Sequence, residues 1–175
     1  MTTTAPEPET AATSRPKPDF IVRAAELRDV APIVQMIREL AAFEQLEHLM
    51  QATPEKLRPH LFGEKPAAEA MVAEVDGKAI AFALYFTNFS TFLAQPGLYL
   101  EDLYVQPAHR AKGVGEALLT RLAKLAVERD CGRFEWSVLD WNANAIRFYE
   151  RMGATVMPDW RICRISGGAL QAFAP

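Results

Sequence analysis

The sequence predicts an α/β fold with a mixed sheet and helices on both of its faces. Two observations support this prediction. Strand and helix patterns alternate over residues 20–165, and Asp76-Gly77 lies between two β-prone segments, a pattern typical of a tight antiparallel hairpin. An antiparallel hairpin followed by strand, helix, strand, helix and strand gives a sheet with both antiparallel and parallel neighbours.

Each element is predicted from its local pattern. In chain order we expect a strand over 20–23, helices over 30–43 and 54–61, hairpin strands over 70–75 and 78–87, a loop over 88–97, a strand over 98–105, a long helix after residue 113, a strand over 133–139, a helix over 144–151 and a final strand over 161–165. Asp29 is placed to cap the first helix. Thr53-Pro54 supplies a cap and a proline at the first helical position of the second. One apolar face defines the long helix, made of Val114, Ala117, Leu118, Leu122, Leu125 and Ala126.

Composition indicates an ordinary globular domain and narrows the possible partners. The chain has 175 residues, 50% of them hydrophobic, and a formal net charge of −3, which is not the basic footprint of a nucleic-acid binder. Residues 1–18 contain no apolar run for a signal peptide or membrane span, and the two cysteines and three histidines show no metal-ligand spacing. We therefore expect a disordered tail over 1–18, a single domain over 19–175, no metal, no membrane or nucleic-acid partner, and a cytoplasmic location.

A glycine-containing turn follows the strand that ends at Val105. The turn reads Arg110-Ala111-Lys112-Gly113-Val114-Gly115 and leads directly into the long amphipathic helix. Backbone N–H groups at the start of a helix bind anions, and glycine lets the backbone approach a ligand closely. The spacing is neither that of a dinucleotide fold nor that of a P-loop. This turn therefore suits a pyrophosphate.

A second constellation spans residues 140–154, DWNANAIRFYERMGA. Taken alone, it describes a capped helix, with Asn142 or Asn144 as N-cap and Gly153 at the C-terminal end. Together with the glycine turn upstream, however, it resembles the acetyl-CoA site of the GNAT superfamily of N-acetyltransferases. The similarity is greatest to the diamine branch, which includes spermidine/spermine and thialysine N-acetyltransferases.

The resemblance implies a GNAT-like fold, in which the strand before the glycine turn and the strand after its helix are parallel and splay apart. Here these are the strand ending at Val105 and the strand over 133–139, and a bulge is expected near residues 101–103. The gap between the strands would hold the pantetheine arm of acetyl-CoA.

Acetyl transfer to an amine requires a proton acceptor, because a lysine-like amine with a pKa of about 10.4 is almost fully protonated at neutral pH. Glu101, a carboxylate in an otherwise apolar strand, is the candidate acceptor, directly or through a water. Tyr149 is the candidate general acid for the departing thiolate. The alternatives are a carboxylate at a solvated edge and a tyrosine that only packs beside Phe148.

The remaining site residues follow from the resemblance. The residues expected to bind the cofactor are Leu103, Tyr104, Val105, Arg110, Ala111, Lys112, Gly113, Val114, Gly115, Glu116, Asn142, Ala143, Asn144, Ala145 and Tyr149. Those expected to bind the substrate are Phe43, Glu44, Glu101, Glu135, Trp136, Ser137 and Asp159. A homodimer is also expected.

The substrate is expected to be a small cationic primary amine: a diamine, a polyamine or a lysine-like amino acid such as thialysine. Phe43 stands where the spermidine/spermine enzymes carry a tyrosine, and the segment between Ala154 and Trp160 is shorter and less acidic than theirs. A compact amine is therefore at least as well supported as a long polyamine. Two alternatives are acetylation of a protein or peptide amine, and a non-catalytic acyl-CoA-binding regulator.

Overall fold

A computed structural model describes residues 19–174, so the tail expected over 1–18 lies outside the described residues. The chain divides into two compact units, one ending at Trp136 and the other beginning at Ser137.

The first unit is built on a five-stranded sheet with three α-helices. Its elements are β1 (Ile21–Ala24), η1 (Leu27–Asp29), α1 (Val30–Phe43), η2 (Glu47–Leu49), α2 (Pro54–Phe62), β2 (Glu69–Val75), β3 (Lys78–Ser90), β4 (Gln95–Val105), η3 (Pro107–His109), α3 (Val114–Glu128) and β5 (Arg133–Trp136). The strands lie in the order β1-β2-β3-β4-β5. All neighbours are antiparallel except β4 and β5, which are parallel. The predicted mixed sheet, hairpin and parallel pair are confirmed.

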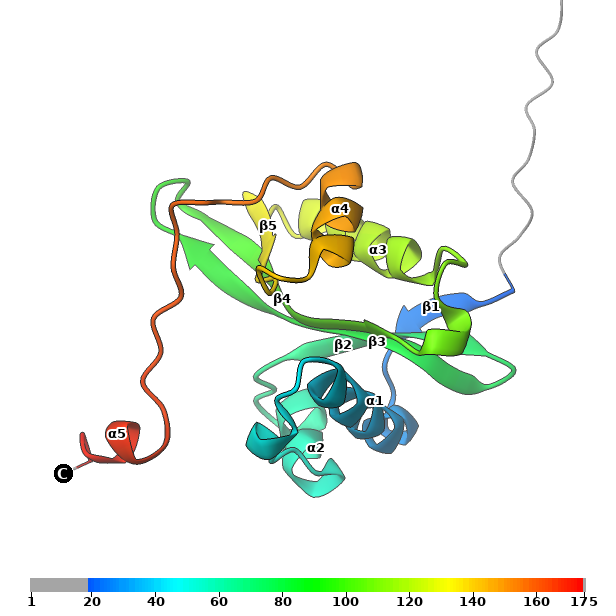
Figure 1. The fold of residues 1–175 in the computed structure, drawn as a ribbon, viewed down its shortest axis with the longest axis horizontal. Coiled ribbons are helices and arrows are strands. Elements are labelled where there is room, and N and C mark those ends of the chain that lie inside the picture. The colour runs from blue at the N-terminus through cyan, green and yellow to red at the C-terminus, as the bar shows by residue number, and fades with distance from the viewer. Residues whose placement is uncertain (1–18, 175) are drawn as a thin grey trace, which may run out of the picture. The chain divides into compact units, whose positions relative to one another are not determined.

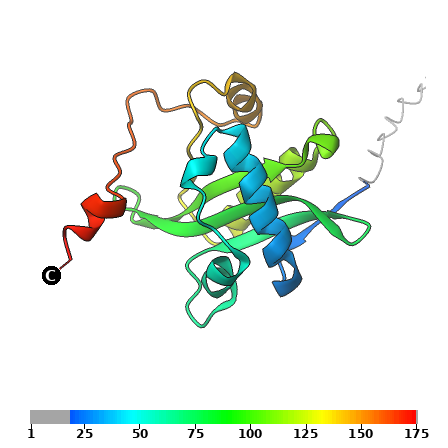
Figure 2. The ribbon, with the colours of Figure 1, turned by 60° about the horizontal axis from the view of Figure 1, so that its bottom comes forward.

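Helices cover both faces of this sheet, as predicted (Figure 1). On one face, α1 crosses the strands (Figure 2) and packs with α2 against β2, β3 and β4. The core on that face consists of Ile33, Met36, Leu61, Ala70, Val72, Phe82, Leu84 and Tyr104. On the other face, α3 buries Leu118, Leu119 and Leu122. Both faces of the sheet are therefore apolar, so a charged side chain on one of its strands is costly to bury without a partner.

The loop expected over residues 88–97 is wrong, because the strands on either side of it, β3 and β4, are both longer than predicted. β3 continues to Ser90 and β4 begins at Gln95, with Phe89 opposite Pro96 and Asn88 opposite Gly97. The short turn between the strands is closed by the Ser90 hydroxyl, which accepts a hydrogen bond from the Leu93 N–H (3.3 Å). Proline and glycine suggested a loop, but cross-strand pairing overrides these local preferences.

The second unit contains α4 (Ala143–Arg151) and a short α5 (Gly167–Gln171). The strand expected over 161–165 is wrong: these residues are exposed and pair with no strand in the described part of the chain. The β-prone sequence suggested a strand, but a strand forms only where a neighbour satisfies its backbone groups. The strand expected over 133–139 is present but ends earlier than predicted, because β5 stops at Trp136.

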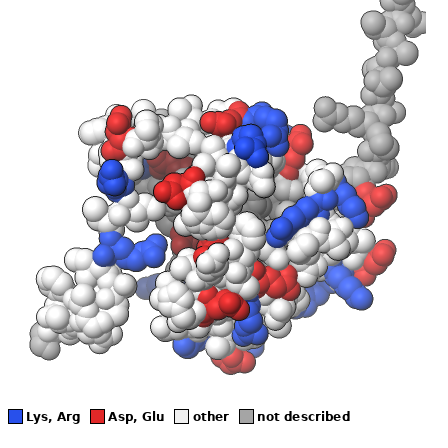
Figure 3. Space-filling model, viewed as in Figure 1, with Lys and Arg blue, Asp and Glu red and all other residues white. Residues whose placement is uncertain are grey.

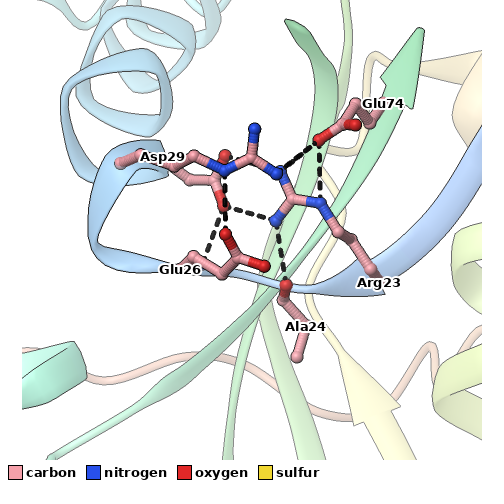
Figure 4. Close-up of polar contacts among 6 residues, drawn as sticks. Arg23, Ala24, Glu26, Asp29 and Glu74 are labelled. Carbon is pink, nitrogen blue, oxygen red and sulfur yellow. Dashed lines mark hydrogen bonds and ion pairs between the residues drawn. The ribbon is translucent and has the colours of Figure 1, made fainter. Parts of the chain in front are cut away.

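Asp29 occupies the N-cap position of α1, but its side chain makes no capping hydrogen bond. The buried carboxylate instead accepts two hydrogen bonds from Arg23 (2.6 and 2.9 Å) and one from the Glu26 N–H (2.7 Å). The same guanidinium also pairs with Glu74 of β2 (Figure 4). Burial alone would raise the pKa of Asp29, but hydrogen bonds from Arg23 and Glu26 outweigh it and lower that pKa. Arg23 therefore joins β1, β2 and the start of α1.

Replacing Arg23 with glutamine is expected to lower the free energy of unfolding by about 3 kcal/mol at pH 7, because it leaves the Asp29 carboxylate buried without its charge partner. Since the folded pKa of Asp29 is depressed, this stabilisation is present above its unfolded pKa of about 3.9 and disappears as the pH falls further. Urea unfolding at pH 7 measures the loss. Arg121→Gln, which breaks an exposed pair with Glu128, is the matched control and should cost less than about 1 kcal/mol. Equal losses in the two variants would contradict the role assigned to Arg23.

Candidate active site

The predicted bulge lies in β4 at Glu101. Leu84 of β3 is opposite Asp102 while the next residue, Tyr85, is opposite Leu100, so Glu101 is the extra residue of β4. Such a bulge changes the direction of side chains and is often found next to active sites.

The bulge places two successive carboxylates on one face of the sheet. Before the bulge, the Tyr99 ring packs against the Phe86 ring (5.1 Å between centroids). Phe86 is two residues from Leu84 and four from Phe82, so all three lie on the face that carries α1. After the bulge, Tyr104 packs into the core on that same face. Side chains alternate along a strand, so Glu101 lies on the same face as Tyr99, and Asp102 on the same face as Tyr104. Both carboxylates therefore lie on the face that carries α1. A regular strand would have separated them.

The end of α1 adds a third carboxylate. Glu44 is the C-cap of α1, and burial raises its pKa. Burial also raises the pKa of Asp102 to about 6, with further contributions from the charges of Glu101 and Glu44, whereas Glu101 is exposed. Glu44, Glu101 and Asp102 therefore lie near enough for their charges to interact and form an acidic cluster. Asp102 lies beside Glu101 in the same apolar strand, and its raised pKa depends on the bulge and on the charge of Glu44.

Replacing Asp102 with asparagine is expected to stabilise the fold. A raised carboxyl pKa means that the folded state holds its proton more tightly, so the stability of the wild type falls as pH rises from about 4 to 6. The variant lacks this penalty and should gain about 2–3 kcal/mol at pH 8 and almost nothing at pH 4. Urea unfolding at the two pH values measures the gain. A gain that does not depend on pH would contradict this explanation.

The end of β4 presents backbone N–H groups away from β3. The Gln106 N–H donates to the Ile80 carbonyl of β3 (3.0 Å), so by alternation the N–H groups of Tyr104 and Asp102 also point toward β3. Those of Leu103 and Val105 point to the side on which β5 pairs. Pairing with β5, however, ends where Leu100 lies opposite Trp136. The N–H groups of Leu103 and Val105 therefore lie beyond the paired region, as expected for two parallel strands that splay apart.

The glycine turn has the backbone geometry of an anion-binding site. Ala111 and Gly113 both have positive φ (59° and 79°), and Gly113 is the N-cap of α3. The first N–H to bond within the helix is that of Ala117, which donates to the Gly113 carbonyl (2.9 Å). The N–H groups of the three preceding residues, 114–116, have no acceptor within the helix and meet the positive end of its dipole. The geometry of the turn thus fits the pyrophosphate that its sequence predicts.

Arg110 brings together residues predicted to bind different ligands. Its Nε donates to the Val105 carbonyl (2.8 Å). Its guanidinium carbon lies 5.7 Å from the centre of the Phe43 ring and 5.4 Å from that of Tyr104. Phe43 was assigned to the amine, whereas Arg110 and Tyr104 were assigned to the cofactor.

β5 carries two of the predicted substrate residues. The Glu135 carboxylate pairs with Arg133 (2.8 Å) and accepts a hydrogen bond from the Asn88 side chain (3.3 Å). The Trp136 ring packs beside Phe134 (4.9 Å). Arg133 thus already neutralises part of the charge of Glu135. The acidic cluster on β4 and α1 is the better candidate for meeting a cation.

The second unit holds the other predicted residues: Ser137, Asn142–Ala145, Tyr149 and Asp159. The Asn142 side chain caps α4 by accepting a hydrogen bond from the Ala145 N–H (3.2 Å), which confirms its predicted capping role. The Tyr149 ring packs beside Phe148 (5.3 Å), and Gly153 follows the end of the helix with φ 91°. Asp159 lies in the exposed segment after α4.

The surface charge, the possible metal ligands and the helix lengths concern binding to nucleic acid, metal ions and membranes. Lys, Arg, Asp and Glu are interspersed on the face seen in Figure 3, without one continuous basic field. Residues 19–174 contain no group of three or more His, Cys, Asp or Glu side chains placed to hold a metal ion. Across the same residues, every helix is too short or too polar to cross a membrane.

Comparison with known proteins identifies the family. Residues 34–154 match the acetyltransferase (GNAT) family. The chain is 35% identical to L-ornithine N5-acetyltransferase of Arabidopsis thaliana, over 98% of this chain and 96% of that protein. It is also 35% identical to thialysine N-epsilon-acetyltransferase of Mus musculus, over 87% and 96% of the two chains. An integron cassette protein of V. cholerae shares the fold, with a TM-score of 0.74 and 24% identity over 88% of this chain and 96% of that one.

The chain therefore belongs to the GNAT family of acetyltransferases. Within that family it is an N-acetyltransferase with relatives in the branch suggested by the sequence motifs.

Proposed function

We propose that this protein transfers the acetyl group of acetyl-CoA to the primary amine of a small cationic substrate by direct attack of the amine on the thioester. The bulge at Glu101 is the observation that carries this proposal. It gathers two carboxylates of β4 and one of α1 at the point where pairing between β4 and β5 ends. An amine bound there would lie next to the thioester and next to the carboxylate that accepts its proton.

In this proposal the cofactor is held mainly by backbone groups. The N–H groups of residues 114–116 would bind the pyrophosphate, with Lys112 adding positive charge. The N–H groups of Leu103 and Val105 would hydrogen-bond the thioester carbonyl and the pantetheine amides. Donors aimed at the carbonyl stabilise the negative charge that develops there during attack. Residues 142–145 would contact the pantetheine arm.

Two side chains would move protons. The ammonium group of the substrate binds as a cation and then gives one proton to Glu101, directly or through a water, which frees its lone pair for attack on the carbonyl carbon. As the carbon–sulfur bond breaks, the Tyr149 hydroxyl would donate a proton to the departing thiolate. The products are the acetylated amide and CoA, and the two protein groups regain their starting states by exchange with solvent.

The acidic cluster favours an amine that carries a further positive charge or a polar group near the reacting nitrogen. Ornithine and thialysine, the substrates named for two relatives, are compact amino acids with a side-chain amine. Phe43 at the cluster offers a ring without a hydroxyl. We therefore rank a diamine or a lysine-like amino acid above a long polyamine. The homodimer and the cytoplasmic location stay predictions.

A substrate panel tests the proposal. The protein is incubated with acetyl-CoA and ornithine, thialysine, lysine, putrescine or spermidine, and the release of free CoA is followed. Turnover with at least one compact amine, with mass spectra showing a single added acetyl group, is the expected result. Acetylated peptides but no acetylated small amines would favour the protein-amine alternative. Tight CoA binding without turnover on any amine would favour the non-catalytic alternative.

A further inference from the structure

Arg110 makes contacts that link the end of α1, the end of β4 and the glycine turn. Its guanidinium lies beside the ring of Phe43, which is 46% exposed, and beside the ring of Tyr104, which is buried. Burial raises the pKa of the Tyr104 hydroxyl, as does Glu39, whereas Arg110 opposes the rise. A planar guanidinium can face an aromatic ring and donate hydrogen bonds at its edge at the same time. Arg110 does both, because its guanidinium lies beside the two rings and its Nε donates to the Val105 carbonyl.

The hydrogen bond from Arg110 Nε closes a loop over residues 105–110. Within this loop, the His109 N–H donates to the Gln106 carbonyl (2.9 Å) and the Arg110 N–H to the Pro107 carbonyl (3.3 Å). The next residue, Ala111, has the left-handed φ of 59°, which a non-glycine residue holds only where its surroundings impose it. Arg110 thus fixes the point at which the chain enters the turn.

We propose that Arg110 is a positioning residue that acts through the Val105 carbonyl and the Phe43 and Tyr104 rings. It orients the glycine turn for the pyrophosphate and the Phe43 ring for the amine, so that the affinities for both substrates depend on it. This inference rests on the proposed function, and it specifies how Arg110, expected among the cofactor-binding residues, would act. What matters in this role is the Nε donor and the planar group. A lysine, which has neither, cannot fulfil it.

Isothermal titration with CoA tests the cofactor half of the proposal without requiring turnover. Arg110→Lys keeps the charge, and Arg110→Met removes the charge together with every N–H donor of the side chain. Both variants are expected to weaken CoA binding alike, by about tenfold, because both lose the Nε bond and the stacked geometry. Arg121→Gln removes the same charge from the surface of α3 and should bind CoA as the wild type does. Wild-type affinity in Arg110→Lys together with weak binding in Arg110→Met would overturn the proposal in favour of a charge effect.

Phe43→Leu tests the link to the amine side. This variant keeps Arg110 but removes a ring that the proposal assigns to the amine, and it should still weaken CoA binding about threefold. At saturating acetyl-CoA, Arg110→Lys and Phe43→Leu should each raise the KM for the amine, and the double variant should add little to either one. Unchanged CoA affinity in Phe43→Leu, or fully additive effects on KM, would overturn the coupling. Failure of the wild type to bind CoA or turn over any amine would instead reject the proposed function.

Discussion

Replacement of Tyr149 with phenylalanine is expected to lower kcat by about 10²–10⁴-fold while leaving the KM for the amine within a few-fold of the wild type. The phenol is proposed to act only when the carbon–sulfur bond breaks, so its loss affects the transition state more than the bound substrates. The ring itself stays and still packs beside Phe148. Steady-state release of CoA measures the effect.

The leaving group provides the control for this prediction. A thioester of a more acidic thiol than CoA needs less proton donation, so the loss in Tyr149→Phe should shrink with such a donor. Tyr85→Phe is the matched variant, because the Tyr85 hydroxyl interacts with Glu69, at the start of β2, rather than with the proposed site. If the two tyrosine variants were equally active, or if the loss in Tyr149→Phe were the same for every leaving group, Tyr149 would not be the acid.

Replacement of Glu101 with glutamine is expected to lower kcat/KM for the amine by about 10²–10³-fold at pH 7. Glutamine keeps the shape of the side chain but cannot accept the proton of the substrate ammonium. Because the free amine becomes abundant only near its own pKa of about 10.4, the deficit should narrow steadily as the pH is raised toward 9.5. A pH profile of kcat/KM for both proteins measures this.

Glu128→Gln is the matched control for the loss of a carboxylate, since Glu128 lies at the exposed end of α3 in a pair with Arg121. It should behave as the wild type. A deficit in Glu101→Gln that stays constant between pH 7 and 9.5 would indicate a binding role for Glu101. It would assign the proton transfer elsewhere, with Asp102 as the neighbouring carboxylate.

Local chemistry made much of the first unit predictable. Asp76-Gly77 specifies a tight turn, and both residues do adopt positive φ between β2 and β3. Gly113 marks the place where the chain needs a left-handed residue to begin α3. The motif resemblance added the bulge at Glu101, which periodicity alone could not supply, and identified which two strands are parallel.

Contacts between distant residues could not be predicted in the same way. Arg110 meets Phe43 only because the end of α1 lies against the end of β4, and no sequence pattern encodes that meeting. The environment of Asp102 depends on a bulge and on the distant Glu44 together. Residues 161–165 have a strand-like composition, but a strand depends on a partner, which composition does not reveal.

Direct transfer from acetyl-CoA to a small amine is tested most plainly by a single-turnover experiment. Enzyme in excess is mixed with acetyl-CoA and thialysine, and the quenched reaction is analysed by mass spectrometry for acetylated amine and for intact protein. We expect one acetyl group to appear on the side-chain amine at the rate at which CoA is released, and the protein mass to stay unchanged. An acetylated protein that forms before the product, or CoA release without acetylated amine, would contradict the proposed reaction.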